Sequence, residues 1–151
     1  MMVILDKSSS MQTGTIGAET KWDIAVSALD QVTGQFDDQV ELGLTLFPNP
    51  NQCAPGAMMV APALSTHSQI MRQLADAPPT AGNWTPMSQT LDAVAQQPSM
   101  ATGDMPRYAV LITDGWQWCS PYDPGTRFDP AASVSDLSAA GITTYVVGFG
   151  D

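Results

Sequence analysis

Five short segments of the chain are rich in apolar residues and have the length of β-strands. They cover residues 2–5, 40–47, 58–61, 108–113 and 143–149. Several are continuously apolar, which is typical of strands buried on both faces of a parallel sheet. Stretches rich in proline, glycine and polar residues separate them, and we expect loops there, including residues 12–20 and 115–129.

Four other segments repeat apolar residues at helical spacing. The clearest covers residues 21–34, where Trp22, Ile24, Ala25, Ala28, Leu29 and Val32 recur and Gly34 is a natural end. The other three begin at Ser65-Thr66, Thr85-Pro86 and Pro130-Ala131, and end before Pro78, near residue 97 and at Ala140. In the order β α β β α α β α β, these elements predict an α/β fold. Its sheet is mostly parallel and is flanked by helices on both faces.

Polar side chains follow two of the predicted strands. Asp6 stands at the end of the first strand and Asp114 at the end of the fourth. Three serines, Ser8, Ser9 and Ser10, come directly after Asp6. Open α/β sheets bind ligands at the carboxyl ends of their strands, near the point where the strand order reverses. These residues therefore mark a candidate site.

Length and charge narrow the classes of function. The 151 residues are enough for one domain with a real core. The 15 acidic and five basic residues give a formal net charge of −10, which repels phosphate backbones and argues against a nucleic-acid partner. No apolar run approaches the roughly 20 residues of a membrane-spanning helix. The apolar start is too short for a signal peptide, so we expect the chain to be cut from a longer precursor.

The two cysteines, Cys53 and Cys119, lie in predicted loops and form no C-x-x-C motif. They are either free thiols in a reducing cell or a disulfide in an oxidising, extracytoplasmic compartment. We favour the disulfide.

Several chemistries can be weighed from the residues alone. A serine nucleophile would need a base, and the one histidine, His67, lies in a predicted surface helix, with no G-x-S-x-G elbow in the chain. Phosphate-binding glycine motifs are absent. Aspartyl-phosphate chemistry at Asp6 normally wants a second aspartate where Ser8 stands. A hard-metal site fits best, because Mg²⁺ takes oxygen ligands and uses few carboxylates.

Three short motifs carry a family resemblance. The sequence Asp6-x-Ser8-x-Ser10, the threonine of Thr85-Pro86, and Thr113-Asp114-Gly115 at a strand end resemble the metal-ion-dependent adhesion site of von Willebrand factor type A domains. The stretches "WDIA" and "YVVGFG" are also similar to that family. The loop around Cys53 and the cysteine after the fourth strand resemble a bacterial secreted subgroup.

The resemblance implies one domain over residues 1–151, a Rossmann-like doubly wound fold. Its strand order would be 3-2-1-4-5, with one antiparallel edge strand. The family usually adds a sixth strand and a last helix, which we expect to be absent here. In this order Cys53 and Cys119 would form a disulfide at the rim of the metal site. Trp84, Trp116 and Trp118 would lie beside that site as candidate partner contacts, or pack on their own loops.

The resemblance also implies roles for the site residues. Ser8 and Ser10 would bind the metal directly, and Thr85 would bind it directly or through water. Asp6 and Asp114 would hold waters and serine hydroxyls around the metal. A Mg²⁺, Ca²⁺ or Mn²⁺ ion would then take a Glu or Asp of a protein partner as its last ligand, without catalysis.

Less specific explanations of the same residues stay open. Ser8 and Ser10 could simply cap the turn, Thr85 could serve only as a helix N-cap, and Asp114 could be an ordinary turn residue. Ser9 and Asn83-Trp84 stand where the family usually has glycines. The alternatives for function are a structural or assembly module with a vestigial or purely stabilising metal site, and, less favoured, a Mg²⁺-dependent phosphatase-like enzyme.

Overall fold

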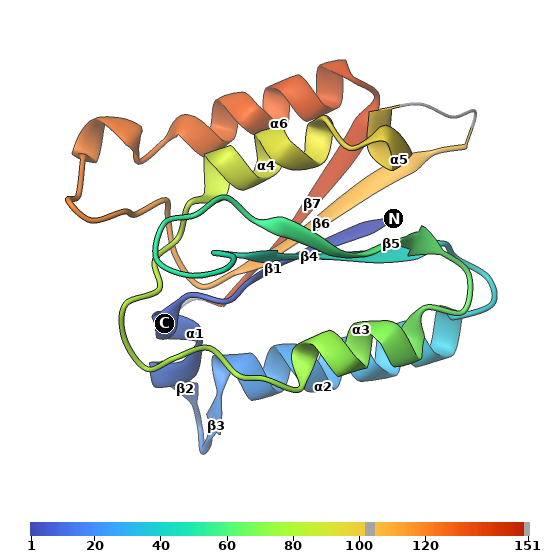
Figure 1. Cartoon of the computed structure of the whole chain (residues 1–151), viewed down its shortest axis with the longest axis horizontal. Coiled ribbons are helices and arrows are strands. Elements are labelled where there is room, and N and C mark those ends of the chain that lie inside the picture. Colours follow the sequence, from blue (N-terminus) through green and yellow to red (C-terminus); the bar gives the residue numbers. More distant parts are fainter. Residues whose placement is uncertain (102–104, 150–151) are drawn as a thin grey trace.

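A five-stranded sheet forms the middle layer of the computed structural model, which describes residues 1–101 and 105–149 (Figure 1). Its strands are β1 (Met2–Asp6), β4 (Leu42–Phe47), β5 (Ala57–Ala63), β6 (Arg107–Thr113) and β7 (Ile142–Gly148). Their order is β5-β4-β1-β6-β7, and only the β4–β5 pair is antiparallel. The predicted α/β fold and strand order are therefore confirmed.

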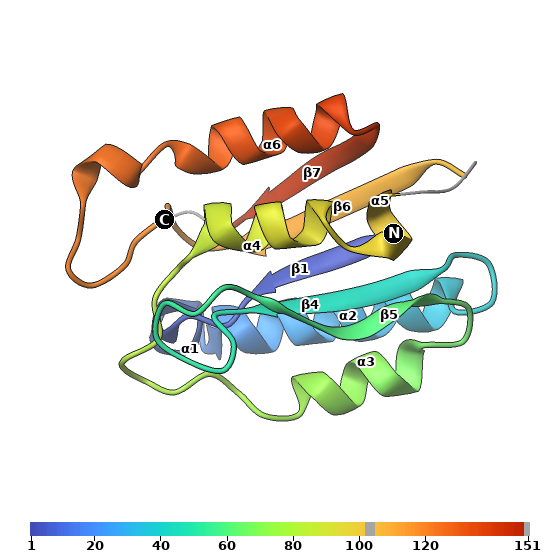
Figure 2. The same ribbon diagram turned by 45° about the horizontal axis from the view of Figure 1, so that its top comes forward.

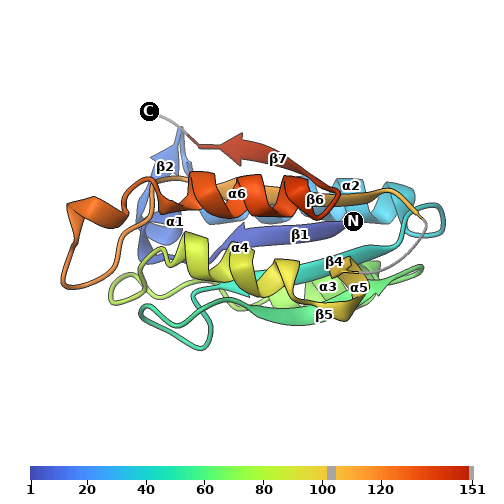
Figure 3. The same ribbon diagram turned by 90° about the horizontal axis from the view of Figure 1, so that it is seen from above.

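Helices cover both faces of the sheet. On one face lie α2 (Lys21–Phe36) and α3 (His67–Leu74); on the other lie α4 (Met87–Ala95), α5 (Pro98–Ala101) and α6 (Asp129–Ala139). Seen from above, α4 and α6 lie over the sheet, and β5 and β7 form its two edges (Figure 3). None of the helices within the described residues is long and apolar enough to cross a membrane.

The first four residues of strand β1 are apolar, because both faces of the strand are covered. All five of its residues are buried. Val3 and Leu5 pack in the core on the α2 side, whereas Met2 and Ile4 pack in the core on the α4 side. Because side chains alternate along a strand, those on one face of β1 belong to one core and those on the other face belong to the other core. The strand therefore carries its last residue, Asp6, into the interior of the molecule.

The structure corrects several local predictions. The expected loop at 12–20 contains α1 (Ser9–Thr13) and a hairpin of β2 (Thr15–Ile16) and β3 (Glu19–Thr20), all too short for a periodic signal. A 3₁₀ turn, η1 (Pro124–Thr126), lies in the expected loop at 115–129. Helix α2 continues past Gly34 to Phe36. In this helix Thr33 is buried, whereas the apolar Val32, which was expected on the buried face, is exposed. The N-cap of α4 is Pro86, not Thr85.

Strand β7 is less buried than the strands in the middle of the sheet. Ile142 at its start is buried, but Tyr145, Val146 and Val147 are 56%, 61% and 47% exposed. Only β6 pairs with β7 within the described residues, so β7 is an edge strand. Its apolar composition therefore reflects strand propensity more than burial.

Two substitutions on adjacent strands test this difference in burial. Leu111 of β6 is paired in register with Val146 of β7, yet Leu111 is 3% exposed. Leu111→Ala is expected to lower the free energy of unfolding by about 2–5 kcal/mol, because it leaves a cavity in the core. Val146→Ala, the matched control, is expected to change it by less than about 0.5 kcal/mol. Urea unfolding of both variants measures the contrast, and equal losses would contradict the described burial.

Candidate metal centre

Four loops meet at the carboxyl ends of the parallel strands. They follow β1, β4 and β6 and precede α4 (Figure 2). The chain leaves β1 toward α2 on one face and leaves β6 toward α6 on the other face. The strand order therefore reverses between β1 and β6, where doubly wound sheets bind ligands.

Asp6 lies beneath these loops and is fully buried. Its Oδ1 accepts the backbone N–H of Ser8 at 2.7 Å, and its Oδ2 accepts the hydroxyl of Thr113 at 2.6 Å. Burial raises the pKa of the Asp6 carboxyl to about 6, against the opposing effect of the bonds from Thr113 and Ser8. A carboxylate buried and bonded in this way supports the loop and is poorly placed to act as a phosphate-attacking nucleophile.

Ser8, Ser10 and Asp114 form a continuous chain of polar contacts. The Oγ atoms of Ser8 and Ser10 are 3.0 Å apart, and the Ser10 hydroxyl donates to Asp114 Oδ1 at 2.8 Å. Ser8 is the N-cap of α1, but its side chain makes no capping hydrogen bond. Helix capping therefore does not explain why a hydroxyl stands at Ser8. Asp114 is not only a turn residue, because its carboxylate accepts the hydrogen bond from Ser10.

Thr85 is held in place by its backbone. Its N–H donates to Trp118 O at 2.9 Å and its carbonyl accepts from Trp118 N–H at 3.2 Å. This isolated bridge joins the loop before α4 to the loop after β6. Thr85, Ser8, Ser10 and Asp114 all line one open hollow of about 540 Å³. The structure thus brings four of the predicted site residues to one hollow, with Asp6 beneath them.

The donor set suits a hard divalent cation. The hollow is lined by one carboxylate, that of Asp114, and by hydroxyl residues: Ser8, Ser9, Ser10, Thr13 and Thr85. Oxygen atoms are the ligands that Mg²⁺, Ca²⁺ and Mn²⁺ prefer. Within residues 1–101 and 105–149, no group of three or more His, Cys, Asp or Glu side chains could hold a metal. A cation here would therefore be held mainly by hydroxyls and water, with few charged ligands.

Asn83 and Lys21 belong to the site although sequence reasoning assigned them no role there. The buried Asn83 accepts Ser9 N–H on its carbonyl (3.0 Å), accepts Gln52 N–H on Oδ1 (3.0 Å), and donates from Nδ2 to Lys7 O (3.3 Å). It therefore joins three loops. Lys21 Nζ lies 3.0 Å from Asp114 Oδ2. These contacts of Asn83 and Lys21 cannot be recognised in the sequence, because they join segments that are distant along the chain.

The three predicted tryptophans all line the hollow. Trp84 and Trp118 have ring centroids 5.6 Å apart, and Trp118 also stacks on Tyr122 at 6.1 Å. The guanidinium of Arg127 lies 4.1 Å from the centroid of Trp116, which is still 54% exposed. Each ring packs on a neighbour and also presents surface at the hollow, so the two explanations of these residues are compatible.

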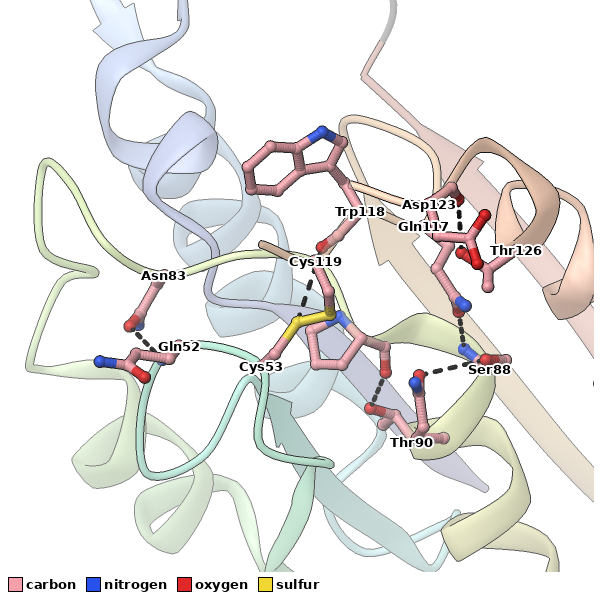
Figure 4. Close-up of a disulfide and its surroundings, with 12 residues drawn as sticks. Gln52, Cys53, Asn83, Ser88, Thr90, Gln117, Trp118, Cys119, Asp123 and Thr126 are labelled. Carbon is pink, nitrogen blue, oxygen red and sulfur yellow. Dashed lines mark hydrogen bonds between the residues drawn. A yellow bond between two sulfur atoms is a disulfide. The ribbon is translucent and has the colours of Figure 1, made fainter. Parts of the chain in front are cut away.

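The predicted disulfide between Cys53 and Cys119 is present, with their Cα atoms 5.8 Å apart (Figure 4). It joins the loop after β4 to the loop after β6, on either side of the end of β1. Beside it, Gln117 Oε1 accepts the N–H of Ser88 at 2.7 Å and so ties the same loop to α4. Cross-linking residues 66 positions apart stabilises by roughly 4 kcal/mol on the chain-entropy model.

A larger hollow of about 790 Å³ lies away from this end of the sheet. Its walls are mainly apolar side chains, such as Val32, Phe36, Leu64 and Met105. It offers a packing surface instead of a set of ligands, so the chemistry points to the smaller hollow.

The model of the von Willebrand factor type A (VWA) domain matches residues 1–151 of the chain. The chain belongs to the VWA family. In sequence, no curated protein matches this VWA domain at a significant level.

Solved structures similar to this VWA domain agree with its fold. An aerotolerance-related membrane protein from Bacteroides fragilis has a TM-score of 0.72 at 19% identity, over 97% of this chain and 65% of that chain. Manganese-loaded TRAP protein from Plasmodium vivax has a TM-score of 0.68 at 15% identity, over 99% of this chain and 57% of that chain. The pilus adhesin SpaC from Lactobacillus rhamnosus GG has a TM-score of 0.70 at 13% identity, over 97% of this chain and 24% of that chain. This VWA domain spans less than two thirds of each of these chains.

The buried Asp6 predicts an unusual pH dependence of stability. Its pKa is about 6 when folded and takes its ordinary value of 3.8 when unfolded. Between these values the folded state binds more protons, so stability rises as pH falls through 6 and levels off below about 4, by up to about 3 kcal/mol. Urea unfolding in chelator at several pH values measures this gain.

Asp6→Asn is the matched control, because it keeps the shape of the side chain and cannot titrate. The difference in unfolding free energy between the native chain and this variant should change over that pH window. A difference that stays constant with pH would contradict the raised pKa.

Proposed function

We propose that this VWA domain is a divalent-metal-dependent protein-binding module, which grips an acidic residue of its partner. The observation that carries the proposal is the convergence of Ser8, Ser10, Thr85 and Asp114 on one open hollow at the switch point of the sheet. An open site with few charged ligands leaves a bound cation able to attract one more carboxylate.

Each of these residues would have its own role at the metal. Ser8, Ser10 and Thr85 would ligate a Mg²⁺, Ca²⁺ or Mn²⁺ ion through their hydroxyls. Asp114 would orient Ser10, to which it is already bonded, and Asp6 would hold the loop through the Ser8 backbone. The cation would supply a positive charge at the surface, open to one outside ligand.

The charge of the chain supports a role for the cation in partner binding. A protein with a net charge of −10 repels acidic surfaces, so a bridging cation is needed to hold a Glu or Asp side chain against it. Trp84, Trp116 and Trp118 line the same hollow and would add apolar contact area around that side chain.

The disulfide supports an extracytoplasmic location, because such bonds persist in oxidising compartments. Two structural neighbours agree with this, since one is described as a membrane protein and another as a pilus adhesin. The fully buried Asp6 gives an aspartyl-phosphate mechanism little support, so we propose no enzymatic activity.

Calorimetric titration of Mg²⁺ and of Mn²⁺ into chelator-treated protein tests the metal site. The native chain should bind one ion, and Ser10→Ala should weaken binding at least about tenfold, because it removes a ligand hydroxyl. Ser9→Ala is the matched control, since the Ser9 hydroxyl accepts Asn83 N–H and takes no part in the contacts with Asp114. Absence of binding to the native chain would refute the proposal.

Panning a phage-displayed peptide library tests the partner. Phage retained on the native domain with Mn²⁺ and released by chelator should be enriched in peptides with a Glu or Asp. The Ser10→Ala domain should enrich none of them. If metal binds but no acidic peptide is enriched, the site serves only the fold, and the structural or assembly alternative is favoured.

A further inference from the structure

Lys21 places a positive charge against the candidate metal centre. Its Nζ lies 3.0 Å from Asp114 Oδ2, and the residue is only 8% exposed. The other oxygen of the same carboxylate accepts the Ser10 hydroxyl at 2.8 Å. Among the residues that the structure describes, this is the one ion pair in which a lysine or arginine contacts a carboxylate.

The position of Lys21 is unfavourable for a lysine in two respects. It is the first residue of α2, and a cation at a helix N-terminus meets the positive end of the helix dipole. Its ammonium also loses most of its contact with water, which is costly unless the charge is paired. The ion pair with Asp114 offsets both costs, and such exceptions to local rules concentrate at functional sites.

A local device holds Lys21 in this place. The β2–β3 hairpin turns the chain back, so that Lys21 N–H donates to Gly14 O at 3.0 Å, while Gly14 N–H donates to Ser10 O at 2.7 Å. A Cβ on Gly14 would lie 2.8 Å from Cε and 3.0 Å from Cδ of Lys21. The missing side chain of Gly14 thus makes the space in which the lysine stem lies.

We propose that Lys21 is a fixed counter-charge of the metal centre. It weakens the hold of the centre on the divalent cation and strengthens the hold of the loaded centre on an acidic partner. This inference rests on the proposed function. Counted by the formal charges of Asp6, Asp114 and Lys21, the centre carries one net negative charge without a cation. A divalent cation then makes the centre net positive by one, whereas without Lys21 the loaded centre would be neutral.

The same contact orients the carboxylate of Asp114. Lys21 and Ser10 each occupy one of its two oxygens. Lys21 is therefore a positioning residue, and its effect on the cation and its effect on a carboxylate ligand have opposite signs. A purely structural lysine would not produce this pair of opposite effects.

Lys21→Met tests the inference, because it keeps an unbranched, flexible side chain and removes the terminal ammonium with its charge. Calorimetric titration should show Mg²⁺ binding about tenfold more tightly to this variant than to the native chain, as expected for losing one nearby like charge. Acetate titrated into the Mg²⁺-saturated protein and followed by NMR should bind roughly threefold or more weakly. Lys21→Arg, which keeps the charge, should resemble the native chain in both measurements.

Lys7→Met is the matched control. Lys7 lies in the loop between Asp6 and Ser8, but its ammonium lies over the ring of Trp22, 5.8 Å from the centroid. This variant removes one positive charge close in sequence to the site without touching Asp114, so both affinities should stay within about twofold of native.

The outcomes separate the two proposals. If the native chain binds Mg²⁺ and Lys21→Met binds it with the same affinity, the counter-charge is refuted and the proposed function stands. If the native chain binds no Mg²⁺, both are refuted. Should Lys21→Met fail to fold, Lys21→Gln keeps a hydrogen-bond donor for Asp114 without the charge, and unchanged Mg²⁺ and acetate affinities in that variant would equally refute the counter-charge.

Discussion

The buried carboxylate of Asp6 is the interaction on which the rest of the candidate centre depends. It joins the backbone of the loop after β1 to the last residue of β6, through Ser8 N–H and the Thr113 hydroxyl. Burying a carboxylate is costly, and the raised pKa of Asp6 measures part of that cost. Both oxygens accept hydrogen bonds from neighbouring segments, which offsets part of this cost. These bonds also hold the segments that carry Ser10 and Asp114 in a fixed position relative to each other. The serine hydroxyls above it can then face the hollow.

The architecture could be predicted from the sequence because its central strands are covered on both faces. Such strands are continuously apolar, and β1, β4 and β6 follow this rule. At β7 the same apolar composition occurs at an exposed sheet edge, so apolar composition identifies a strand there but does not show that the strand is buried. The elements that escaped prediction, namely α1, the strands β2 and β3, α5 and η1, each have five residues or fewer. No hydrophobic period can be recognised over so short a length.

The site divides in a similar way. Asp6, Ser8, Ser10 and Asp114 could be located because they stand at strand ends, and the topology brings strand ends together. Asn83 and Lys21 could not, since their roles arise from contacts between loops that are distant in the sequence. The expectation that Thr85 caps a helix was wrong by one residue, because the cap falls on Pro86. Thr85 is instead held by its backbone pairing with Trp118, a contact that no local pattern announces.

The disulfide closes a loop of the chain that contains only part of the candidate centre. Thr85 and Asp114 lie between Cys53 and Cys119 along the chain, whereas Asp6, Ser8 and Ser10 precede the first cysteine. A protease that cuts one peptide bond between the two cysteines therefore leaves two fragments that cannot diffuse apart. One fragment ends beyond Cys53 and keeps the serines, and the other carries Cys119 and Asp114 wherever the cut precedes residue 114. A single nick between Cys53 and Cys119 thus leaves every residue of the centre within one covalent molecule.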